Sequence, residues 1–145
     1  MENDKVVRAV LIDFQKAFDQ VSHEGLVFKL TKKGVKGKAL NWIADYLHDR
    51  TIQAMIDGVT SAPRGISKGV PQGSILGPSL FLIYIDDLPI GIESAIRLFA
   101  DDTLRFSHDS DLVLASQRLA RDLIRVIEWA KNASRTVEVN IQKPE

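Results

Sequence analysis

Two adjacent carboxylates stand between two apolar runs in residues 98–106, LFADDTLRF. This pattern predicts a tight β-hairpin with Asp101 and Asp102 at its tip. Like charges repel, so an aspartate pair fixed in a turn needs cations or water to offset the repulsion. Carboxylate oxygens suit hard ions such as Mg²⁺, and Mg²⁺ with paired carboxylates is typical of phosphoryl chemistry. An isolated Asp-Asp dipeptide is more often part of a solvated turn than of a metal site. The rest of the chain decides between these two interpretations.

A third carboxylate follows an apolar, β-branched run. Residues 6–12 predict a buried strand that ends at Asp13. A carboxylate at this place would be held rigidly and partly desolvated. If the strand lies beside the 98–106 hairpin, Asp13, Asp101 and Asp102 meet at one edge of a sheet. Three such carboxylates could hold two Mg²⁺ ions roughly 3.5–4 Å apart, the spacing used for in-line phosphoryl displacement.

The remaining patterns predict a mixture of helices and strands. Ser22 can cap a helix over 23–33 that Gly34 stops, and Asp109 or Ser110 can cap a long helix that ends near residue 132. The other expected elements are helices over 36–48 and 74–86, a hairpin over 51–68, a loop over 69–73 and a last strand over 136–140. Together they predict one α+β domain over residues 1–145, an antiparallel sheet with helices packed on one face.

Composition narrows the classes of function. The 145 residues include no cysteine, which rules out a disulfide framework or a thiolate metal site. No apolar run is long enough for a membrane span and no signal peptide is expected, so an intracellular protein without a membrane partner is predicted. The formal net charge of zero counts against tight nucleic-acid binding by this piece alone. Two basic groups are interpreted as solvated faces in preference to phosphate contacts: Lys29, Lys32, Lys33, Lys36 and Lys38, and Arg118, Arg121 and Arg125.

Two further groups of polar residues are not interpreted as catalytic or metal-binding. Asp86 and Asp87 precede Pro89 and are interpreted as a helix stop rather than a second metal site. Asp19, Ser22 and His23 lie within one helical turn, whereas a catalytic triad normally assembles across the fold, so a triad is not predicted.

Four patterns appear in order along the chain. The first covers residues 11–23, LIDFQKAFDQVSH, and the second covers residues 69–88, GVPQGSILGPSLFLIYIDDL. The third is FADD at 99–102, and the weaker fourth is NIQK at 140–143. As an ordered set they are highly specific, and the chain resembles the palm of a reverse transcriptase from a non-LTR (LINE-type, jockey-like) retrotransposon.

The resemblance implies an RNA-directed DNA polymerase with a split βαβ-like palm, its fingers and thumb absent from this chain. Asp13 and Asp101 would bind two Mg²⁺ ions, for which Mn²⁺ can substitute. Asp102 would be a weaker ligand and the Phe14 carbonyl a further one. Lys143 would protonate the leaving pyrophosphate.

The resemblance also implies which residues meet the substrates. Phe18 would lie beneath the sugar of the incoming nucleotide and exclude a ribose 2′-hydroxyl, although by itself such a residue is more often a core aromatic. Gln72 and Gly73 would contact the nucleotide and the template, and Ala100 would lie beneath the primer end. The partners would be an RNA template, a DNA primer, deoxynucleoside triphosphates and the rest of a polyprotein, in the cytoplasm and nucleus if the element is eukaryotic.

Two alternatives stay open at the level of sequence. The chain could be a truncated, catalytically inactive retroelement product that persists as a folded relic or a binding module. More distantly, it could be a metal-dependent nuclease, whose acidic spacing need not be accompanied by the loop that contains Gln72 and Gly73.

Overall fold

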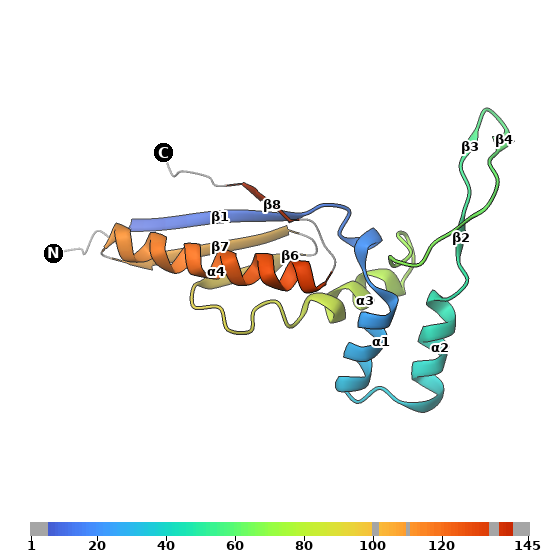
Figure 1. Ribbon diagram of the computed structural model, residues 1–145, viewed down its shortest axis with the longest axis horizontal. Coiled ribbons are helices and arrows are strands. Elements are labelled where there is room, and N and C mark those ends of the chain that lie inside the picture. The colour runs from blue at the N-terminus through green and yellow to red at the C-terminus, as the bar shows by residue number, and fades with distance from the viewer. Residues whose placement is uncertain (1–5, 100–101, 110, 134–136, 141–145) are drawn as a thin grey trace. The chain divides into compact units, whose positions relative to one another are not determined.

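The computed structural model describes residues 6–99, 102–109, 111–133 and 137–140 (Figure 1). The chain divides into two compact units. The sheet unit comprises Met1–Ala17 and Ile85–Glu145, and the helical unit comprises Phe18–Tyr84. Each unit is described by itself.

The sheet unit is built on a four-stranded antiparallel sheet in the order β6-β7-β1-β8. Figure 1 shows the long strands β1 and β7 with helix α4 running along them. The elements of this unit are β1 (Val6–Phe14), β6 (Ala95–Phe99), β7 (Asp102–Asp109), α4 (Leu112–Asn132) and β8 (Val137–Asn140). The predicted hairpin arms and the predicted last strand are therefore confirmed. Asp102, predicted at the hairpin tip, is instead the first residue of β7, because its backbone pairs with Phe99 and with Asp13.

Strand β1 is buried on one face only. Val10, Ile12 and Phe14 are 4%, 1% and 2% exposed, whereas Leu11 is half-buried and Asp13 is exposed. This alternation arises because successive side chains of a strand point to opposite faces. Helix α4 packs against β7 and β1, so the sheet has one covered face that carries the core of this unit.

The start of α4 differs from the prediction. Asp111, and not Asp109 or Ser110, is the cap, and its carboxylate accepts hydrogen bonds from the backbone N–H groups of Val113 and Leu114 at 2.7 and 3.4 Å. Asp109 pairs with Val6 as the last residue of β7, so the chain is still extended there and the helix begins later than expected.

The helical unit contains η1 (Phe18–Gln20), α1 (His23–Lys32), α2 (Gly37–Leu47) and most of α3 (Leu76–Ile85). Ser22 caps α1 as predicted, since its hydroxyl oxygen accepts a hydrogen bond from the backbone N–H of Gly25 at 3.2 Å. Helices α1 and α2 pack against each other. No helix among the described residues combines the length and the apolar character needed to cross a membrane.

The predicted hairpin over 51–68 is present as two short pairings. Strands β2 (Thr51–Ile52) and β5 (Arg64–Gly65) pair at its base, and β3 (Met55–Ile56) and β4 (Val59–Thr60) pair near its tip. The tip turns at Asp57-Gly58, a dipeptide favoured in two-residue hairpin turns. All residues of the four strands are exposed, so the hairpin is held by its backbone pairing rather than by a core.

Candidate active site

The ends of β1 and β7 bring two predicted acidic residues together. Asp13 and Asp102 are direct partners in the antiparallel register, and the Cα atoms of such pairs are about 4.5–5.5 Å apart. This confirms that the first strand lies beside the hairpin. Asp101, Ala100 and Lys143, also predicted as site residues, lie outside the described residues.

The environment of Asp13 differs from the prediction in one respect. Its side chain is exposed and not partly desolvated, because it alternates with the buried residues Ile12 and Phe14 and so lies on the face of β1 opposite them. An exposed carboxylate is open to an ion and to a substrate from solution.

The residue types at the ends of β1 and β7 suit a hard cation. Carboxylate and carbonyl oxygens are the ligands that Mg²⁺ prefers, and Asp13, Asp102 and the Phe14 carbonyl supply only oxygen. Within the described part of the chain no group of three or more His, Asp or Glu side chains gathers as a metal site. The predicted set of three carboxylates includes Asp101, which lies outside the described residues.

An aromatic contact holds the end of β1 next to Asp13. The Phe14 and Trp129 rings meet edge to face with centroids 5.9 Å apart, and the Trp129 indole N–H donates to Asp87 Oδ1 at 2.9 Å. Because Asp87 bonds an indole and α3 ends at Ile85, the interpretation of the Asp86-Asp87 pair as a helix stop is supported. The apolar periodicity of the α4 sequence did not predict that Trp129 would contact the end of β1.

A buried carboxylate anchors the chain just before β6. Asp122 is 0% exposed, and its two oxygens accept hydrogen bonds from the backbone N–H groups of Glu93 at 3.1 Å and Ser94 at 2.8 Å. These bonds fix the start of the hairpin that leads to Asp101 and Asp102. Asp122 was not predicted, although an acid amid the apolar stripe of α4 is a signal that could have found it.

The arginines of α4 take part in this anchor. Arg121 contacts Glu93 at 3.2 Å, and Arg125 contacts Glu93 and Asp122 at 3.4 Å each. Arg125 also donates to the Gly91 carbonyl. Two of the three arginines of this helix face, Arg121 and Arg125, thus have partners within the sheet unit.

In the helical unit, the loop of the second motif runs beside the end of the first motif. The Val70 N–H donates to the Phe18 carbonyl at 2.9 Å, and the Gly69 N–H donates to the Val21 carbonyl at 2.7 Å. The Gln72 side-chain amide donates to Asp19 Oδ1 at 3.2 Å. Two patterns about 50 residues apart in sequence therefore form one local structure.

Two glycines of this motif are required by close backbone approach. Gly69 has φ +96°, and a Cβ atom there would lie 3.0 Å from Asp19 Cα and 3.1 Å from its carbonyl oxygen. A Cβ on Gly77 would collide with the Pro71 carbonyl oxygen. These positions account for part of the glycine pattern by packing alone.

The residues predicted to meet a nucleotide lie at the surface of this local structure. Phe18 is half-buried and stacks on Phe81, with ring centroids 4.4 Å apart and an interplanar angle of 21°. Gln72 and Gly73 are exposed. The stacking agrees with a core role for one face of Phe18, and the contacts of these residues with substrates stay predictions.

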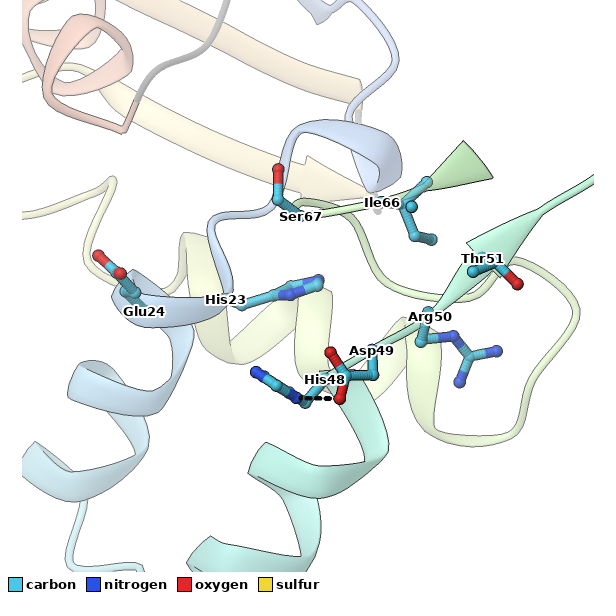
Figure 2. Close-up of a pocket in the computed structure, with 9 residues that line it drawn as sticks. His23, Glu24, His48, Asp49, Arg50, Thr51, Ile66 and Ser67 are labelled. Carbon is cyan, nitrogen blue, oxygen red and sulfur yellow. Dashed lines mark ion pairs between the residues drawn. The ribbon is translucent and has the colours of Figure 1, made fainter. Parts of the chain in front are cut away.

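The helical unit also contains a cavity of about 640 Å³ that none of the predicted site residues lines (Figure 2). His23 Nε2–H donates to the Gly69 carbonyl at 2.8 Å, and His48 Nδ1 lies 3.1 Å from Asp49 Oδ2. Ser22 caps α1 and His23 bonds a backbone carbonyl, so both side chains have structural contacts. Among the described residues that line this cavity, no three His, Asp or Glu side chains gather as a group that could hold a metal ion.

The first lysine of the basic group has a structural contact. Lys29 Nζ donates to the Tyr84 carbonyl at 2.6 Å and lies 4.8 Å from the Tyr84 ring centroid. Lys32 Nζ lies 5.4 Å from the ring centroid of Phe28. These two lysines thus pack on aromatic side chains of the helical unit.

Comparisons with known proteins agree with the order of the motifs. Residues 1–144 match the family model described as reverse transcriptase (RNA-dependent DNA polymerase). The chain is 31% identical to the RNA-directed DNA polymerase from mobile element jockey of Drosophila melanogaster, over 99% of this chain and 16% of that protein. It is 27% identical to the retrovirus-related Pol polyprotein from the type-1 retrotransposable element R2 of Popillia japonica, over 97% of this chain and 22% of that protein.

The fold has a solved counterpart. An apo telomerase from Candida tropicalis, truncated from its C-terminal domain, matches with a TM-score of 0.56 and 14% identity, over 96% of this chain and 32% of that chain. This likeness concerns the fold alone. The chain thus spans about a sixth to a third of the lengths of the proteins it matches here.

Proposed function

Because the chain belongs to the reverse transcriptase (RNA-dependent DNA polymerase) family, we propose that it supplies the catalytic palm of a non-LTR retrotransposon polymerase. The observation that carries the proposal is the register that pairs Asp13 with Asp102 at the ends of β1 and β7. Both residues lie within the segment that matches the family model. The relatives named for jockey and R2 support the non-LTR class.

In the proposed reaction, the 3′-hydroxyl oxygen of a DNA primer attacks the α-phosphorus of a deoxynucleoside triphosphate paired with an RNA template. The bond from that phosphorus to the oxygen bridging it to the β-phosphorus breaks, and pyrophosphate leaves. The hydroxyl proton passes to water, and Lys143 would donate a proton to the pyrophosphate. The primer is thereby extended by one nucleotide.

Asp13, Asp101, Asp102 and the Phe14 carbonyl would hold two Mg²⁺ ions, with Mn²⁺ as a substitute. Bound ions would supply electrostatic stabilisation of the charge that develops on the phosphoryl oxygens. The exposure of Asp13 and the all-oxygen donor set support this assignment. The β1–β7 register would keep two of the acidic positions fixed.

The nucleotide would meet residues of the first and second motifs. Phe18 would lie beneath the sugar of the nucleotide, and the Phe81 ring, which stacks on Phe18, would keep the Phe18 ring in place. Gln72 and Gly73 would contact the nucleotide and template, with Asp19 orienting the Gln72 amide. Ala100 would lie beneath the primer end, and the rest of the polyprotein would complete the grip on the nucleic acid.

The test is primer extension on an RNA template with Mg²⁺. The purified chain is compared with a chimaera in which these residues replace the matched segment of the Drosophila melanogaster jockey polymerase. We expect the chimaera to extend the primer, and we expect Asp13→Asn and Asp101→Asn to lower the rate by roughly 100-fold or more, since bound metal ions contribute several kcal/mol to such reactions. Asp57→Asn, at the exposed hairpin tip, is the matched control and should extend normally.

Two results would overturn the proposal. If the chimaera with Asp101→Asn extended the primer normally, the carboxylate of Asp101 would not be needed for the reaction. A chimaera that folds but extends no primer with Mg²⁺ or Mn²⁺ would favour the catalytically inactive alternative.

A further inference from the structure

One ridge of helix α2 alternates between cations and aromatic rings. Lys38, Trp42, Tyr46 and Arg50 follow one another at intervals of four residues, and residues four apart on a helix are neighbours on its surface. Arg50 lies just beyond the end of α2 at Leu47. We call these four residues the α2 ridge.

The rings and the guanidinium of the ridge form a stacked ladder. The Trp42 and Tyr46 ring centroids are 6.2 Å apart with an interplanar angle of 26°. The Arg50 guanidinium carbon lies 5.2 Å from the Tyr46 ring centroid, and Arg50 Nη1 donates to the Tyr46 carbonyl at 3.1 Å. Figure 2 shows the Arg50 side chain extending away from that of His48. Arg50 is thus held against the Tyr46 ring.

The ladder is open at its Trp42 end. Trp42 is 58% exposed and Lys38 is exposed, whereas Tyr46 and Arg50 are half-buried. An exposed tryptophan ring that already stacks on a second ring offers a flat surface for a third planar group. Aromatic side chains beside cations that contact phosphates are the means by which proteins bind single strands without reading their sequence.

Charge favours an anionic occupant of this surface. Residues 23–50 contain six lysines and arginines against three aspartates and glutamates, although the whole chain sums to zero. Of the two acids nearest the ridge in sequence, Asp49 contacts His48 at 3.1 Å and Asp45 is exposed. The positive balance is therefore local to α1, α2 and their connection.

We propose that the α2 ridge binds single-stranded nucleic acid, with a base stacked on Trp42 and phosphates at Lys38 and Arg50. A base must be unstacked from its neighbours to lie on a protein ring, so a single strand fits and a continuous duplex does not. The proposal rests on the proposed function only for the identity of the strand, which would be the RNA template. Binding itself needs neither metal nor polymerisation.

The test measures the fluorescence anisotropy of a short fluorescein-labelled oligouridylate, titrated with the full chain at low salt in EDTA. We expect Trp42→Ala to weaken binding roughly 5- to 140-fold, the effect typical of losing one base–aromatic stacking contact. Trp42→Phe should retain most of the affinity because a ring remains. The matched control is Phe28→Ala, which removes another exposed aromatic, 62% exposed and beside Lys32, that lies on α1 outside the ridge.

Salt dependence tests the cations separately. Lys38→Ala should make the slope of log affinity against log salt shallower by about 0.7, the value for one phosphate contact on a single strand. Asp45→Asn should raise the affinity, because it removes a negative charge beside the ridge. These two surface substitutions keep the proposal testable even if Trp42→Ala fails to fold.

The proposal is overturned if Trp42→Ala binds as tightly as the unaltered chain, if Phe28→Ala loses as much affinity, or if duplex RNA competes better than the single strand. The chimaera described above separates the two proposals. Asp101→Asn should bind the oligonucleotide normally while losing extension. If a Trp42→Ala chimaera lost primer extension but bound the oligouridylate normally, the α2 ridge would instead be a surface at which protein segments contact each other, and the proposal would be wrong.

Discussion

The two compact units place the same residue types in opposite environments. Ile12, Asp122 and Trp129 belong to the sheet unit, and their counterparts Ile56, Asp19 and Trp42 belong to the helical unit. The three residues of the sheet unit are buried or half-buried, whereas the three residues of the helical unit are exposed.

At these six positions, burial separates the side chains that contribute to the stability of a unit from those that stay accessible at its surface. Removing apolar area from water stabilises a fold by about 25 cal/mol per Å². Most substitutions of exposed side chains, by contrast, change the free energy of unfolding by less than about 0.5 kcal/mol. The sheet unit therefore has the means to hold Asp13 and Asp102 in register. The helical unit leaves apolar and aromatic surface accessible to a ligand.

The largest contrast is expected for the two isoleucines. Ile12→Ala should lower the free energy of unfolding by about 3 kcal/mol, because it deletes buried methyl groups and leaves a cavity. Ile56→Ala makes the same chemical change where the side chain is 71% exposed, and should cost less than about 0.5 kcal/mol. Urea denaturation followed by far-ultraviolet circular dichroism measures both. Equal losses would mean that the hairpin of the helical unit has a core of its own.

The second contrast concerns two carboxylates. Asp122→Ala leaves the N–H groups of Glu93 and Ser94 without their acceptor, and Ser94 is buried. A buried donor left unsatisfied costs about 1–3 kcal/mol, so we expect a loss of about 2–3 kcal/mol. Asp19→Ala removes an acceptor from exposed Gln72 and should cost below about 1 kcal/mol.

Hydrogen exchange checks the cause of that loss. Asp122→Ala should speed exchange at the Glu93 and Ser94 amides more than at the amides of β1. Uniform acceleration across the sheet unit would instead attribute the loss to a general weakening of the fold.

The local elements could largely be predicted from the sequence because their signals are local. The cap at Ser22, the β-branched run before Asp13 and the turn at Gly58 each depend on a few neighbouring residues. The cap of α4 at Asp111 was missed because three candidate polar residues occur in a row and only strand pairing decides among them. Asp109 is held in β7 by its partner Val6.

The candidate site was predictable only in part. The sequence predicted that Asp13 and Asp102 would meet only if the first strand lay beside the hairpin, and the β1–β7 register meets that condition. The bonds from Asp122 to the start of β6 and from Trp129 to Asp87 join residues 28 to 42 positions apart, which periodicity does not reveal. The stacking of Phe18 on Phe81 is of the same kind, because it depends on how η1 and α3 meet.

The smallest contrast is expected for the two tryptophans. Trp129→Phe keeps an aromatic ring for Phe14 but loses the hydrogen bond to Asp87, and should lower the free energy of unfolding by about 1 kcal/mol. Trp42→Phe should change it by less than about 0.5 kcal/mol, because Trp42 is 58% exposed. Urea denaturation of both variants measures the difference. If Trp129→Phe proved as mild as Trp42→Phe, the indole N–H would be equally well satisfied by water, and the end of β1 beside Asp13 would owe its position to the ring contact and strand pairing alone.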